Sequence, residues 1–111
     1  MSQPLREDSG PDARPDIRPD IGRAPTKADE VAAAVAAAPG VAALSGGRLG
    51  GVGTYLPGRR VTGVIVRDGD LEVHVIGRYG VPVGTIAAEV RRAAEPFASG
   101  QPVHVIIEDL A

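Results

Sequence analysis

An aspartate-glycine turn between two stretches of alternating residues restricts this chain more than any other feature. The segment Arg67-Asp68-Gly69-Asp70 separates residues 61–66 from residues 71–79. Asp-Gly between two such stretches is a strong hairpin signal, because both residue types tolerate the positive φ that a tight turn requires. We therefore predict an antiparallel hairpin, in which Val61, Gly63, Ile65, Leu71, Val73 and Val75 alternate with Thr62, Val64, Val66, Glu72, His74 and Ile76.

Helices are predicted on both sides of this hairpin. Thr26 can cap the first helix, Asp29 stands three residues later as in a capping box, and Pro39-Gly40 ends it. The second helix is predicted from about Pro82 to Ala94 and is stopped before Pro96. We expect a short extended segment over residues 41–44 and a final strand in which Val103, Val105 and Ile107 alternate with His104, Ile106 and Glu108.

This order of elements predicts an α+β fold: a two-layer arrangement, with two helices on one face of a small mixed β-sheet in helix–hairpin–helix–strand order. The domain is expected over residues 26–111. Residues 1–25 read as a disordered, solvated tail rich in Pro, Asp and Arg, in which Arg-Pro-Asp-Ile occurs at 14–17 and again at 18–21. Such a segment has too little apolar surface to offset the entropy lost on ordering.

Only one face of the predicted sheet has an obvious cover. The opposite face is half apolar, and an uncovered face of this kind is a candidate interaction surface. On the predicted alternation it carries Thr62, Val64, Val66, Glu72, His74, Ile76, His104 and Ile106.

Composition excludes several classes of function. The chain has a net charge of −2 and a pI near 5.6, unlike domains whose whole surface binds nucleic acid or acidic membranes. It has no cysteine, which excludes disulfides and thiolate zinc sites. Since neither a signal peptide nor a run of about 18–20 apolar residues is evident, we expect a cytoplasmic protein without membrane insertion.

The glycine-rich stretch over residues 44–60 does not match the phosphate-binding motifs. Gly46 and Gly51 have the spacing of a P-loop, but Val52 occupies the lysine position, and a dinucleotide fingerprint fails at Leu56. We therefore expect no cofactor and predict a flexible connector. Residues 47–50 do spell the GxxG of RNA-binding KH loops, near Arg48, Arg59 and Arg60, so a small RNA-binding domain is the alternative hypothesis, although the flanking residues are poor helix formers.

Catalytic patterns are weak. Side-chain alternation places His74 on the same strand face as Glu72, and His104 on the same strand face as Glu108. If the two strands are neighbours, these four side chains could form one metal site. Alternatively, they are polar residues on an open sheet face. No serine lies in a nucleophile elbow. We predict no catalytic residues, no bound metal and no enzymatic activity.

An ordered set of short segments provides a further indication. A helix ends in Pro39-Gly40-Val41, Ser45-Gly46-Gly47 follows, and Gly58-Arg59-Arg60 closes the glycine-rich stretch. After the hairpin, Tyr79-Gly80-Val81-Pro82 opens a helix, and residues 103–109 form the last strand. Over about residues 28–110 this order resembles the alkaline-shock-protein family, also called envelope stress response proteins.

The resemblance implies a non-enzymatic cytoplasmic protein of bacteria, linked to cell-envelope homeostasis and stress. Some family members are held at the membrane by an anchored protein partner, and some self-associate. The leading hypothesis is therefore a binding or scaffold module that binds a protein partner and can form a homo-oligomer. We do not expect it to bind nucleic acid. We expect its partner to contact His74, Ile76, His104, Ile106, Arg48, Arg59 and Arg60.

Overall fold

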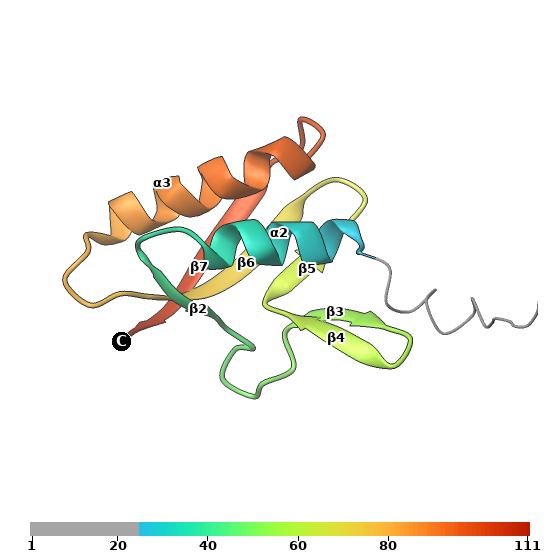
Figure 1. Ribbon diagram of the computed structural model, residues 1–111, viewed down its shortest axis with the longest axis horizontal. Coiled ribbons are helices and arrows are strands. Elements are labelled where there is room, and N and C mark those ends of the chain that lie inside the picture. The colour runs from blue at the N-terminus through green and yellow to red at the C-terminus, as the bar shows by residue number, and fades with distance from the viewer. Residues whose placement is uncertain (1–24) are drawn as a thin grey trace, which may run out of the picture.

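The computed structural model describes residues 25–111, so the expected tail and its repeated tetrapeptide lie outside the described residues. In this part of the chain, two α-helices, one short 3-10 helix and six strands follow one another (Figure 1). They are α2 (Lys27–Ala36), β2 (Val41–Leu44), β3 (Gly53–Leu56), β4 (Arg59–Thr62), β5 (Val64–Val66), β6 (Leu71–Gly77), α3 (Val83–Ala94), η1 (Glu95–Phe97) and β7 (Val103–Leu110).

Strand β6 is the centre of a four-stranded mixed sheet. Along one edge, β5 pairs antiparallel with residues 71–73 and β2 pairs antiparallel with residues 75–77. Strand β7 pairs with β6 in parallel over its whole length, and it therefore occupies the other edge. Strands β3 and β4 form a separate antiparallel hairpin beside this sheet (Figure 1).

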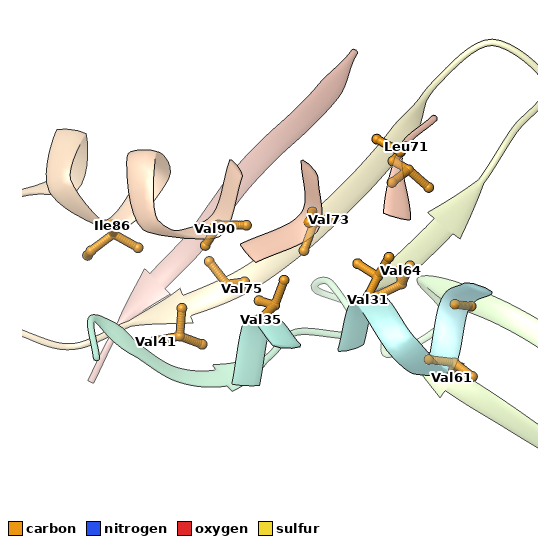
Figure 2. Packing of buried hydrophobic residues seen from close by; sticks show 13 residues of the cluster. Val31, Val35, Val41, Val61, Val64, Leu71, Val73, Val75, Ile86 and Val90 are labelled. Carbon is orange, nitrogen blue, oxygen red and sulfur yellow. The ribbon is translucent and has the colours of Figure 1, made fainter. Parts of the chain in front are cut away.

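The hydrophobic core lies on one face of β6. Figure 2 shows Val35 of α2 and Val90 of α3 directed toward Val75 of β6. Leu71, Val73 and Val75 are at most 1% exposed, because alternate residues of β6 all face the helices. The complete buried cluster is Ala28, Val31, Val35, Val41, Val61, Val64, Leu71, Val73, Val75, Ile86, Val90, Ala94 and Ala98.

The predicted architecture is wrong in its strands, although the α+β class is correct. We predicted a small sheet in helix–hairpin–helix–strand order, but the described residues form six strands in a four-stranded and a two-stranded sheet. The additional strands come mainly from the chain before the predicted hairpin. Residues 53–62, mostly assigned to a flexible connector, make the β3–β4 hairpin around Pro57-Gly58. Gly58 has a φ of 76°, which allows this tight turn.

The predicted strand over residues 61–66 is also interrupted, at Gly63. This glycine has a φ of 81° and separates β4 from β5. Its backbone N–H donates to the Val52 carbonyl, and its carbonyl accepts from the N–H of His74. The interruption changes the side-chain parity, so Val61 and Val64 are both buried in the core, whereas Val64 was expected on the opposite face.

The helix signals are confirmed. Thr26 caps α2 in a capping box, in which the Asp29 N–H donates to the Thr26 hydroxyl and the Asp29 carboxylate accepts from the Thr26 N–H. The second helix begins and ends within a residue of the prediction, at Val83 and Ala94. Neither α2 nor α3 has the length and apolar character needed to cross a membrane.

Replacing Gly63 should test the interruption. A Cβ at Gly63 would lie 2.8 Å from the His74 carbonyl oxygen and 3.0 Å from that of Ser45, in addition to the strain of a positive φ. We expect Gly63→Ala to lower the free energy of unfolding by more than about 2 kcal/mol in urea titrations. Gly69→Ala is the control, since nothing lies within 4 Å of its Cβ position. Equal effects of the two substitutions would contradict the assignment.

Candidate functional site

Most of the expected binding residues lie on the sheet face opposite the core. The strand register places Ile65 opposite Glu72, His104 opposite Glu72 and Ile106 opposite His74. Residues directly opposite one another in a sheet share a face. This face, called the distal face below, carries Ile65, Glu72, His74, Ile76, His104 and Ile106.

His74 is the buried centre of the distal face, with an exposure of 8%. Its Nδ1 lies 2.6 Å from Glu108 Oε2, and its Nε2 lies 2.6 Å from Glu72 Oε2. Both ring nitrogens can donate to these carboxylates only when the imidazole carries two protons. Burial alone would lower the pKa of His74, but the hydrogen bonds that the imidazole donates to Glu108 and Glu72 outweigh it, and the pKa is raised.

The two carboxylates reach His74 by different routes. Glu72 stands two residues earlier on β6, so strand alternation places it on the same face. Glu108 comes from β7, where Ile107 pairs with Val75 and Asp109 pairs with Ile76. Glu108 is thus the extra residue of a β-bulge, a feature that redirects side chains locally. The second carboxylate therefore reaches the histidine from the bulged position of the neighbouring strand.

Further side chains extend this contact into a row of alternating acidic and basic groups. Arg67 Nη1 lies 2.7 Å from Glu72 Oε1 and 3.6 Å from Asp70 Oδ1, and His104 Nε2 lies 3.1 Å from Asp70 Oδ2. Hydrogen bonds from Arg67 and then His74 hold the pKa of Glu72 below its usual range. Exposed ion pairs contribute little stability. The buried contacts of His74 therefore dominate the energetics of the row.

A hollow lies beside Glu108, under the loop between β2 and β3. This loop, residues 45–52, presents Leu49 at 99% exposure, with Arg48 exposed next to it. The hollow has a volume of about 500 Å³ and is lined by Gly46, Gly47, Arg48, Leu49, Gly51, Val52 and Glu108. A smaller one of about 210 Å³ adjoins it and is lined by Ser45, Gly47, Arg48, Ile76, Glu108 and Asp109.

The 45–52 loop is tied to the sheet at both ends. The Ser45 N–H donates to the His74 carbonyl at 2.8 Å, and the Val52 carbonyl accepts from the Gly63 N–H, between β4 and β5, at 2.9 Å. The Val52 N–H in turn donates to the Gly46 carbonyl and closes the loop. Inside the loop, the Gly50 N–H donates to the Gly47 carbonyl. The GxxG tetrapeptide therefore forms a turn between two strands, whereas a KH loop joins two helices.

Arg59 and Arg60 are not directed into the hollow with Arg48. The Arg59 guanidinium holds both carboxylate oxygens of Asp29, at 2.6 and 3.0 Å, and keeps the pKa of Asp29 well below its usual range. The Arg60 guanidinium lies 5.7 Å from the ring centre of Tyr55 and donates to the Gly50 carbonyl. Both arginines thus fasten the β3–β4 hairpin to its surroundings.

The structure brings together some of the predicted site residues. Ile76 and Arg48 both line the smaller hollow, and Ile106 pairs with His74 in the ladder. His104 is exposed and contacts Asp70, apart from the Glu72–His74–Glu108 cluster. Over residues 25–111 no group of three or more His, Asp or Glu side chains has an arrangement that could hold a metal ion. The four-residue metal hypothesis therefore has no support from this geometry.

Comparison with known proteins identifies no relative: no protein-family model, curated protein or solved structure matches this chain. Sequence reasoning missed Leu49, because a single leucine among glycines has no periodicity to indicate burial or exposure. It also missed the row through Arg67 and Asp70, which were assigned only to a turn.

The raised pKa of His74 should be visible in stability measurements. A group that binds its proton more tightly in the folded state stabilises that state fully below its unfolded pKa, and the contribution is lost as pH rises through the folded pKa. We therefore expect the urea midpoint to fall as pH is raised from about 6. His74→Gln should lower stability at pH 6 by about 1–3 kcal/mol and remove this fall.

His104→Gln is the matched control, because His104 is the other histidine and is exposed. It should retain the wild-type pH profile. A profile that flattens in His104→Gln and persists in His74→Gln would contradict the assignment of the shifted proton to His74.

Proposed function

We propose that this protein is a non-enzymatic binding or scaffold module that holds a protein partner at the hollow between the 45–52 loop and the distal face. The observation that carries the proposal is Leu49, which is 99% exposed beside the exposed Arg48 at the rim of that hollow. When a partner covers a leucine that is otherwise exposed to water, the burial of its apolar surface stabilises the complex. Aliphatic and arginine side chains at a concave rim are typical contacts of a protein interface.

The residues around the hollow indicate the chemistry of the partner. Arg48 makes no ion pair or hydrogen bond within the described part of the chain, in contrast to Arg59 and Arg60. A carboxylate of the partner can therefore pair with Arg48 while an apolar side chain packs on Leu49 and Val52. We propose a protein segment that carries both groups.

The base of the hollow is suited to hold a fixed shape. Glu108 lines it and is bonded to the buried His74, which is in turn bonded to Glu72. A buried histidine with both ring nitrogens hydrogen-bonded restrains the two carboxylates that it contacts. The partner then meets a preformed surface, which reduces the entropy cost of binding.

The cellular role is part of the same proposal. The order of segments that resembles the alkaline-shock-protein family supports a role in envelope homeostasis, with a membrane-anchored protein as the partner. The RNA-binding alternative has weaker support, because the GxxG turn joins two strands and Arg60 already donates to a carbonyl of that loop.

A paired substitution at the rim should test the binding site. We expect Arg48→Glu combined with Leu49→Asp to reduce crosslinked recovery of the native partner at least about tenfold, since it repels the carboxylate and removes the apolar contact. Recovery is measured by mass spectrometry after crosslinking in the native cell. The fold should be unchanged, because both side chains are exposed.

Val83→Asp is the control, because Val83 is also an exposed apolar residue, at 56%, but lies on α3 outside the hollow. It should leave recovery unchanged. Equal recovery with wild type and the rim variant would refute the proposed site. Recovery of RNA with a steep dependence on salt would favour the alternative.

A further inference from the structure

Strand β7 forms a long edge of the sheet, and no strand pairs with its outer side among the described residues. It spans eight residues, Val103–Leu110, and among the described residues it pairs with β6 alone. The strands on the other edge, β2 and β5, have only four and three residues. Exposed edges of natural sheets are usually protected by charged side chains, proline, bulges or short length. Residues 103–107 lie before the bulge and the acidic pair at residues 108–109, and they contain no lysine or proline. Over residues 104–107 this edge is open to another strand.

The backbone direction along β7 identifies the groups that face outward. The Leu71 N–H donates to the Pro102 carbonyl, so alternate residues of β7, His104 and Ile106, turn their backbone groups toward β6. Those of Val103, Val105 and Ile107 then point away from the sheet. Arg91 of α3 donates to the Val103 carbonyl at 3.3 Å, in agreement with this direction. Val105 and Ile107 are therefore the outward pairing positions.

We propose that β7 pairs antiparallel with β7 of a second copy of this chain, about a two-fold axis that passes through Ile106. In this arrangement Val105 of each copy lies opposite Ile107 of the other and exchanges backbone hydrogen bonds with it. Ile106 lies opposite Ile106, and His104 lies opposite Glu108. A two-fold contact of this kind is closed and self-complementary, so each favourable pair occurs twice.

Charge and side-chain matching select this register. Outward-facing residues must pair with outward-facing residues, so the axis can move only in steps of one residue along β7. Centring it on Val105 would place His104 against Ile106, and centring it on Ile107 would place Ile106 against Glu108. Centring it on Ile106 pairs an imidazole with a carboxylate and an isoleucine with an isoleucine. Both pairings are favourable between neighbouring strands.

The groups that meet across the interface are already oriented within each copy. His104 is held by Asp70 on one side, and Glu108 contacts His74 through Oε2. Glu108 Oε1 takes no part in this contact and can accept from the second copy. The dimer joins the two four-stranded sheets into one and places two copies of the hollow on the same face, where a partner with two binding segments would gain avidity. The dimer itself does not rest on the proposed binding function.

Single cysteines can test this register, because the chain has none of its own. Directly opposed residues at a non-hydrogen-bonded position have Cα atoms about 4.5 Å apart, which a disulfide can span. We therefore expect Ile106→Cys to form a covalent dimer under mild oxidation, as seen on non-reducing gels. His104→Cys is the matched control on the same strand and face. Its counterpart lies four residues away along the strand, about 13 Å, which is beyond disulfide reach.

The control is stringent because the His104 side chain is 54% exposed, so crosslinking by random collision would favour position 104.

Sedimentation velocity on the full wild-type chain should give the mass of a dimer. Ile106→Lys should give a monomer, because two ammonium groups would meet at the axis, whereas Ile65→Lys, on the distal face of β5, should remain dimeric.

Three results would overturn the proposal: a wild-type monomer at every concentration, crosslinking of His104→Cys equal to that of Ile106→Cys, or dissociation by Ile65→Lys as complete as that by Ile106→Lys. The cysteine variants decide the register even if Ile106→Lys does not fold. The Arg48→Glu and Leu49→Asp variant should still be a dimer, so failure of the binding site and failure of this interface are distinguishable.

Discussion

Strand β6 provides the interaction on which the rest of the structure depends. It is hydrogen-bonded along both edges, to β2 and β5 on one side and to β7 on the other. Its Leu71, Val73 and Val75 are fully covered by residues from both helices. In a core made mostly of valine and alanine, this one covered strand face provides much of the hydrophobic stabilisation.

The other face of β6 is the distal face, which carries the polar contacts beside the hollow. A histidine buried there would be costly if either ring nitrogen lacked a partner. Glu72 from the same strand and Glu108 from the bulge in β7 satisfy both nitrogens. This contact links β7 to β6 through side chains as well as backbone, and so it holds the base of the hollow and the open edge in fixed positions relative to one another.

The elements that local sequence specifies were predictable. The Asp-Gly turn, the Thr26 cap and the proline and glycine stops act within a few residues of where they stand, and the elements they delimit are present. The break at Gly63 was not predictable, because alternation alone treats residues 61–66 as one strand. It follows from contacts with Val52 and His74, which lie 11 residues away in either direction.

The site shows the same division. Sequence alone determined that His74, His104, Glu72 and Glu108 share a face of their strands, because side chains alternate along β-structure. Only the tertiary structure decided that β7 runs parallel to β6 with a bulge, so that Glu108 reaches His74 and His104 does not. Likewise, Arg48 and Arg59 look equivalent in the sequence, yet Asp29 of a distant helix engages Arg59 and leaves Arg48 at the rim of the hollow. Side-chain direction is a local property of a strand, whereas the partner of a charge depends on which distant segments pack against it.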